Sequence, residues 1–182
     1  MKEEFKSIFG FGVVLAILPI IFLLIVSYIR DYLLIDYIHV LSAALWLGSN
    51  LFMGFIFYKI ILDLGENEQI NITKRLIPLT MFFLPAITSV TIASGYMLAF
   101  HLRLFSYSYL IYLPIIIISS VLFLFSFIFY LYDSVKIYYL LYSKHKTKEI
   151  VKLSIRNFKT AFVQLILQII IIGLMAYVVI VF

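Results

Sequence analysis

The sequence contains no cysteine and little charge, and each shortage removes a class of function. Without cysteine there can be no disulfide, thiolate metal site, iron–sulfur cluster or cysteine nucleophile. Charged residues make up 13% of the chain, whereas soluble proteins contain about a quarter. Phosphate-binding glycine loops, HExxH zinc motifs and nucleophile elbows are also absent. The usual signatures of a soluble enzyme are therefore missing.

Hydrophobic residues dominate what is present. They account for 65% of the 182 residues, and the mean hydropathy is +1.14. Both values lie far outside the range of soluble domains. The composition predicts an integral membrane protein.

Five stretches are long and apolar enough to cross a bilayer as helices, which takes about 20 residues each. Strand-like alternation is absent, so we expect an all-α membrane bundle of five transmembrane helices rather than a barrel. We expect one domain over residues 1–182, with the polar stretch 63–75 as its only real loop. The expected spans are 9–29, 37–62, 76–100, 109–132 with an inner-side extension to about 142, and 158–182.

The basic residues are distributed unevenly between the two sides that these spans define. Arg30 and Arg103 fall on one side, and the other twelve of the 14 lysines and arginines fall on the opposite side. Because cytoplasmic loops are rich in Lys and Arg, we expect a multi-pass protein of the cell membrane, with its N-terminus inside and its C-terminus outside. Anionic lipid headgroups then explain the net charge of +5, and nucleic acid is not an expected partner. The twelve are Lys2, Lys6, Lys59, Lys74, Arg75, Lys136, Lys144, Lys146, Lys148, Lys152, Arg156 and Lys159.

The second expected helix carries unusual polar residues. At 100° per residue, His39, Trp46 and Asn50 fall on one narrow face, with Ser42 along its edge. Trp46 lies ten residues after Asp36, about 15 Å into the helix. That depth is near the membrane midplane, so Trp46 should pack against protein or a ligand rather than belong to the interfacial aromatic belt.

The third expected helix brings a second histidine to the same side of the membrane. Its Thr88, Thr91 and Gly95 predict a seam of small residues that lets helices approach closely. His101 follows at the outer end, where the second helix and His39 begin. Two such histidines can supply the axial nitrogens of a b-type haem, bind a metal ion, or hydrogen-bond across the interface. A solvated histidine at a helix end is an equally good interpretation of His101.

Other polar residues in the spans have simpler explanations. Asn157, Gln164 and Gln168 share a face of the last helix and predict interhelical hydrogen bonds. Asp133 has Lys136 one turn later, which predicts a local ion pair. No charged residue lies at mid-membrane, so the pattern does not favour a proton pump or an ion-coupled transporter.

Two segments resemble a known membrane family. In "HVLSAALWLGSNLF", His39, Ser42, Trp46 and Gly48 resemble the H-x2-S-x3-W-x-G signature of the HemJ/CopD-like membrane proteins. The segment "RLIPLTMFFLPAITSVTIASGYMLA" looks like a second block of the uncharacterised prokaryotic branch, where a basic residue enters a helix that ends in a Ser/Thr-Gly pair. The resemblance covers about residues 36–100. It implies a compact helical bundle that holds haem b through His39, with Trp46 and Gly48 beside the macrocycle.

The sequence thus leads to three functional hypotheses. The first is a haem-b protein that transfers electrons between a quinol and a partner or oxidises a porphyrinogen, with His39 and His101 as iron ligands and Ser42, Trp46, Gly48 and Asn50 around the cofactor. The second is a non-catalytic accessory subunit of a larger respiratory or transport complex. The third, permeation of copper or a small solute, rests only on the breadth of the family. The oligomeric state and the redox partner are left open.

Overall fold

The structure, a computed structural model, describes residues 2–103, 109–142 and 147–181, and within them all regular secondary structure is helical. Two segments, η1 and η2, have the wider π-helical turn, and each continues the α-helix before it. The elements are α1 (Lys2–Ile29), α2 (Tyr32–Leu51), η1 (Phe52–Phe57), α3 (Tyr58–Leu62), α4 (Glu66–His101), α6 (Tyr109–Leu124), η2 (Phe125–Leu131), α7 (Tyr132–Tyr142) and α8 (Thr147–Val181).

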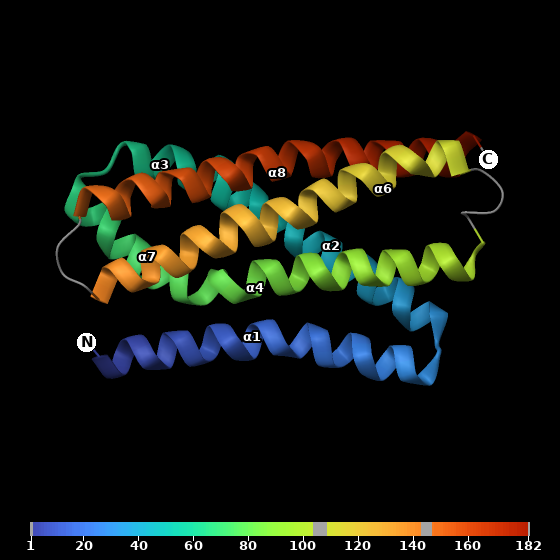
Figure 1. Cartoon of the computed structure of the whole chain (residues 1–182), viewed down its shortest axis with the longest axis horizontal. Coiled ribbons are helices and arrows are strands. Elements are labelled where there is room, and N and C mark those ends of the chain that lie inside the picture. Colours follow the sequence, from blue (N-terminus) through green and yellow to red (C-terminus); the bar gives the residue numbers. More distant parts are fainter. Residues whose placement is uncertain (1, 104–108, 143–146, 182) are drawn as a thin grey trace.

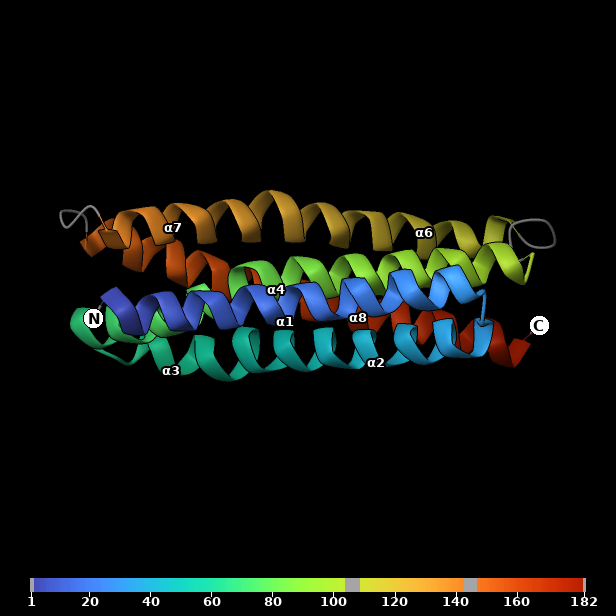
Figure 2. The same ribbon diagram turned by 90° about the horizontal axis from the view of Figure 1, so that it is seen from below.

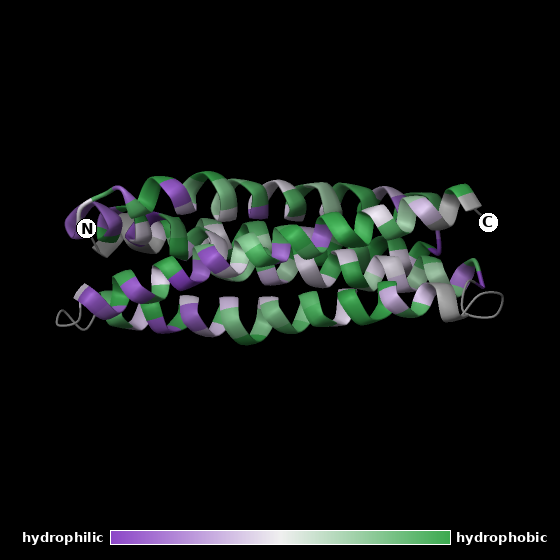
Figure 3. Cartoon of the chain, turned by 90° about the horizontal axis from the view of Figure 1, so that it is seen from above, coloured by the Kyte–Doolittle hydropathy of each residue, from purple (hydrophilic) through white to green (hydrophobic). Residues whose placement is uncertain are grey.

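Five helical stretches within the described residues are long and apolar enough to cross a membrane, which confirms the predicted number of spans. They run along a common long axis, and their connections lie at the two ends of the bundle (Figures 1 and 2). Hydrophilic residues gather toward these ends, and apolar residues cover the middle (Figure 3). The chain is therefore an all-helical, multi-pass bundle. Its spans are Ser7–Ile29, Tyr32–Leu62, Glu66–His101, Tyr112–Leu141 and Thr147–Tyr177.

The two ends of the bundle are named here by residues that lie in them. The Arg30 end holds the turn at residues 30–31, the end of α4 and the start of α6. The Gly65 end holds the turn at residues 63–65, the end of α7 and the start of α8. Asp31 begins α2 by accepting hydrogen bonds from the backbone N–H groups of Leu33 and Leu34, each at 3.1 Å, as a helix N-cap does.

The helices extend further at the Gly65 end than hydropathy predicts. Residue 66 already belongs to α4, so the prediction of a loop over 63–75 is wrong, and α8 begins at residue 147 rather than 158. Polar side chains at this end still find partners in the fold. The Gln69 amide donates to the carbonyl of Ile61 at 2.7 Å, and the Thr73 hydroxyl donates to Ser154 at 3.1 Å. Hydropathy predicts only the part of each helix that lies in the hydrocarbon core. The helices continue beyond it because their polar side chains form hydrogen bonds with neighbouring helices.

The central element of the bundle is α4. It contacts α1, α2, α6, α7, α8 and η2. In its most apolar 18-residue stretch, 56% of the residues are buried inside the bundle, a larger share than in any other candidate span among the described residues. At Gly12 of α1 the two helices approach closely, because a Cβ atom there would overlap the backbone of Pro78 in α4. Small residues at such crossings allow backbones to pack together in a membrane. Helix α4 therefore positions groups contributed by the surrounding helices.

The ion pairs near the Gly65 end join neighbouring helices. Arg156 of α8 pairs with Asp133 of α7, which is 1% exposed, and Lys136 pairs with Glu149 at 2.9 Å. The predicted local pair between Asp133 and Lys136 is therefore wrong. Helical spacing alone suggested it, but the antiparallel packing of α7 on α8 brings an arginine to the buried carboxylate.

Gly54 in η1 offers a direct test of this packing. A Cβ atom there would overlap the backbone of Phe162 in α8, whereas a Cβ on Gly173 would meet nothing within 4 Å. We expect Gly54→Ala to lower the free energy of unfolding by about 1–3 kcal/mol through overpacking. Gly173→Ala should leave it unchanged or raise it by up to about 1 kcal/mol, because alanine favours helices. Thermal unfolding in detergent would compare them, and equal stability of the two variants would contradict the contact.

Candidate functional site

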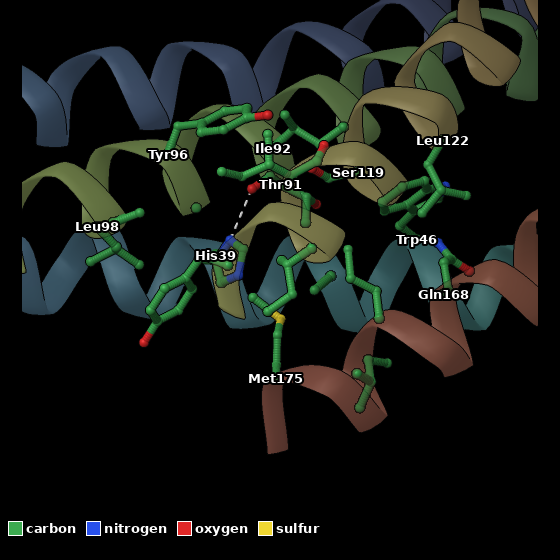
Figure 4. A pocket seen from close by; sticks show the side chains of 18 of the residues that line it. His39, Trp46, Thr91, Ile92, Tyr96, Leu98, Ser119, Leu122, Gln168 and Met175 are labelled. Atoms are coloured by element: carbon green, nitrogen blue, oxygen red, sulfur yellow. Dashed lines mark hydrogen bonds between the residues drawn. The ribbon is translucent and has the colours of Figure 1, made fainter. Parts of the chain in front are cut away.

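A pocket of about 380 Å³ lies between α2, α4, α6 and α8, in the half of the bundle toward the Arg30 end (Figure 4). Its walls are mostly aliphatic and aromatic, with a few polar groups from His39, Thr91, Ser119 and Gln168. Asp36 is the one charged side chain among its described lining residues. A mostly apolar cavity of this size with a few polar groups is typical of a small-molecule site.

His39 is the polar group best suited to bind a ligand. Its Nδ1 atom lies 2.9 Å from the backbone carbonyl oxygen of Thr91 and 3.2 Å from the Ser94 hydroxyl. A carbonyl oxygen only accepts hydrogen bonds, so Nδ1 carries the proton and donates it. The other ring nitrogen, Nε2, then has a free lone pair. Histidines that bind metals are commonly oriented in this way by a backbone carbonyl.

Gly95 makes room for the His39 ring. A Cβ atom at this position would lie 2.8 Å from Cε1 of His39 and 3.3 Å from its Nδ1. The imidazole therefore packs directly on the backbone of α4. The seam of small residues was predicted to let helices approach closely, and the group that approaches Gly95 is the His39 ring.

Ser42 supports His39 from behind. Its hydroxyl donates to the backbone carbonyl of His39 at 3.1 Å and accepts a hydrogen bond from the Thr91 hydroxyl at 2.9 Å. Ser42 is buried, with 4% exposed, and does not line the pocket. Thr91 thus bonds both to the ring and to the adjoining turn of α2. This arrangement fixes α2 against α4 beside the histidine.

The opposite end of the pocket, which we call the deep end, is formed by Trp46, Leu122 and Gln168 (Figure 4). Trp46 packs against Leu122 and Ile87 and is 5% exposed, so of the two predicted surroundings, protein or a ligand, the structure shows contact with protein. The indole Nε1 of Trp46 has no hydrogen-bond partner among the described residues, and neither has Nε2 of Gln168. Both side chains line the cavity, and their nitrogen atoms are buried beside it.

Asn50 holds Gln168 in place. Its Nδ2 atom donates to Oε1 of Gln168 at 3.1 Å and to Oε1 of Gln164 at 3.2 Å. These bonds between α2 and α8 confirm the predicted interhelical role of the two glutamines. Asn50 was predicted to surround a cofactor, but it does not line the pocket. It acts on the pocket only through Gln168.

Two other predicted site residues lie away from the pocket. Gly48 is exposed, and a Cβ atom there would meet nothing within 4 Å. His101 is exposed as well and stacks on Tyr32, with ring centroids 3.3 Å apart. Neither residue lines the cavity. The structure therefore does not bring His39 and His101 together on one cavity.

Sequence reasoning missed the parts of the pocket that come from α6 and α8. Tyr112, Ser119, Ile172 and Met175 line it, but on their own helices these residues look like ordinary membrane-helix residues. Their role depends on which helices are neighbours. The one available signal on α6 was the pair Ser119 and Ser120 in an otherwise apolar stretch.

In comparisons with known proteins, no family model matches the chain, and neither the curated proteins nor the solved structures contain a match.

The tautomer of His39 can be tested by ¹⁵N NMR of the imidazole in isotope-labelled protein. We expect the Nδ1-protonated form in the wild type, because the Thr91 carbonyl requires a donor. Gly95→Ala should shift the His39 signals by displacing the ring, whereas Gly48→Ala, which adds a methyl group in open space, should not. A His39→Gln spectrum identifies the signal. An Nε2-protonated ring in the wild type would refute the geometry.

Proposed function

We propose that this chain is a membrane redox protein that binds b-type haem in the pocket, with His39 as the axial ligand. The supporting observation is the hydrogen bond from Nδ1 of His39 to the Thr91 carbonyl, which leaves the lone pair of Nε2 available for a metal on a side chain that lines the cavity. An imidazole held in this tautomer is suited to bind haem iron. A bound haem would supply one-electron transfer.

The other residues of the pocket fit this cofactor in distinct ways. Thr91 fixes the tautomer of the ligand, and Gly95 leaves room for its ring. Trp46 and Leu122 offer apolar surface to a flat macrocycle. Because His101 stacks on Tyr32 outside the pocket, the fit is to a haem with one histidine ligand from this chain.

A spectroscopic comparison of two histidine variants tests the haem assignment. Purified wild-type protein, supplied with haem during expression or afterwards, should show a Soret band. We expect His39→Ala to reduce haem occupancy at least about tenfold, because it removes the iron ligand. His101→Ala is the matched control and should keep the band, since His101 lies outside the pocket. Absence of a Soret band in the wild type, or equal loss in both variants, would refute the proposal.

We also propose that the Gly65 end faces the cytoplasm and that the membrane is the cell membrane. In this orientation the N-terminus is inside and the C-terminus outside. The proposal is supported by Lys59, Lys74, Arg75 and the basic residues of α8, which gather toward this end, while Arg30 and Arg103 lie at the other. Lys144 and Lys146, which were counted with them, lie outside the described residues. The pocket would then open into the outer half of the bilayer.

Orientation can be measured cleanly because the chain has no native cysteine. Asn67→Cys and Leu33→Cys each place one thiol in the exposed first turn of a helix, at opposite ends of the bundle. In intact cells we expect a membrane-impermeant maleimide to label the Leu33→Cys protein and to spare the Asn67→Cys protein. Both should react after the cells are lysed. The reverse pattern in intact cells would overturn the orientation.

A further inference from the structure

The lining of the pocket becomes more exposed toward the Arg30 end of the bundle. At the deep end, Trp46 and Leu122 are 5% and 0% exposed (Figure 4). At the other end of the cavity, which we call the mouth, Leu102 and Met175 are 59% and 39% exposed, and Asp36 is exposed as well. A molecule can therefore reach the cavity from the mouth.

The mouth carries one charge, and this charge is negative. Asp36 is the one charged side chain among the described lining residues, and it forms no hydrogen bond or ion pair with any described residue. Arg30 and Arg103 lie at the same end of the bundle, but neither lines the cavity. A carboxylate at the edge of an apolar cavity attracts a positive charge and repels a negative one.

Behind the mouth, the cavity follows one face of α2. Its lining residues Asp36, His39, Ala43 and Trp46 recur every three or four positions, which is the spacing of a single helix face. Trp46 lies ten residues after Asp36, about 15 Å along the helix. The cavity thus extends from a carboxylate at its mouth to an indole ring at its deep end.

This combination of shape and charge matches a molecule with a cationic head and an apolar body. We propose that the pocket binds an amphiphilic organic cation, an amine or quaternary ammonium group joined to an apolar part up to about 15 Å long. The positive group lies at Asp36, and the apolar part extends along α2 toward Trp46. The rings of Tyr96 and Tyr112 also line the cavity, and aromatic rings attract organic cations.

The charge distinguishes this ligand from other amphiphiles that dissolve in a bilayer. An amphiphile with a negative head would be repelled by Asp36 when its apolar part lies in the cavity. A neutral amphiphile would fill the apolar part of the cavity but gain nothing from the carboxylate. The lining therefore selects for a positive charge as well as for an apolar body.

This inference goes beyond the proposed haem function and does not rest on it. His39 lies between Asp36 and Trp46 on the lining face of α2, so haem and the amphiphilic cation would be alternative occupants of one cavity. Binding of the cation is therefore measured on haem-free protein. The Soret band reports on haem, whereas the fluorescence of Trp46, the only tryptophan of the chain, reports on the cation.

Two probes with the same apolar chain and opposite charges test the selection. Decyltrimethylammonium and decanesulfonate are titrated into purified full-length protein in phosphatidylcholine vesicles, and Trp46 emission is recorded. We expect a saturable change with the cation and at least about fivefold weaker binding of the anion, the effect of a charge pair at an exposed edge. Equal half-saturating concentrations, or a purely linear response to both probes, would overturn the inference.

Two substitutions of the same kind test the role of Asp36. Asp36→Asn removes the charge at the mouth and should raise the half-saturating concentration of decyltrimethylammonium about three- to fivefold. Asp63→Asn is the matched control, because it removes an equal charge from the exposed turn at the opposite end of the bundle. It should change the value less than about 1.5-fold, since distant exposed charges are screened. Equal values for the two variants would contradict the role of Asp36.

A second pair of variants tests whether the apolar part lies in the cavity. Ala43 lines the pocket, whereas the next residue, Ala44, is exposed and does not. Ala43→Leu should raise the half-saturating concentration at least about fivefold, because a leucine side chain and the ligand cannot share the space. Ala44→Leu adds the same side chain on the outer surface and should leave the value unchanged. Equal affinity of these two variants would overturn the inference.

The two proposals can fail separately. A missing Soret band together with charge-selective binding of decyltrimethylammonium would refute only the haem. A Soret band that depends on His39, together with equal binding of both probes, would refute only the cation site.

Discussion

Inside a bilayer, a polar side chain has to find its hydrogen-bond partner within the protein. In this chain that constraint is met largely on α4, the helix that the other spans surround. The hydroxyl groups of Thr88 and Thr91 and the backbone carbonyl of Thr91 receive partners from α2 and η2. Because these partners lie on different helices, satisfying them also fixes which helices are neighbours. The hydrogen bonds that satisfy the polar groups therefore also determine how the helices pack.

The same interhelical contacts place the residues of the pocket. His39 is placed by the Thr91 carbonyl and by the space above Gly95, so its position is decided by α4 rather than by its own helix. At the deep end, Asn50 draws Gln168 of α8 toward α2. Between these two anchors, α6 and α8 supply apolar walls. The result is a cavity with the His39 imidazole at one end and the side chains of Trp46 and Gln168 at the other.

The sequence pattern predicted some of these roles well and others poorly, for identifiable reasons. Trp46 and His39 were found because a polar or amphipathic residue in an apolar helix is conspicuous, and both line the pocket. Gly48 and His101 were assigned to the same site, one by a motif and the other by membrane depth. The structure places both outside the pocket, because depth and spacing do not determine the direction in which a residue faces. Gln168 was correctly expected to bond between helices, but a helical wheel could not show that its amide oxygen accepts from Asn50 while its side chain lines the pocket.

By itself, the sequence determined the number of membrane-spanning helices, because the thickness of a bilayer demands about 20 apolar residues for each. It also determined that polar groups would be scarce and therefore informative. The tertiary structure decided which polar groups meet: Asp133 with Arg156 rather than Lys136, and His39 with Thr91 rather than His101. It also decided that α4 and α8 begin well before their apolar cores. Hydropathy describes each helix against lipid, whereas partner choice depends on the rotation and neighbours of several helices at once.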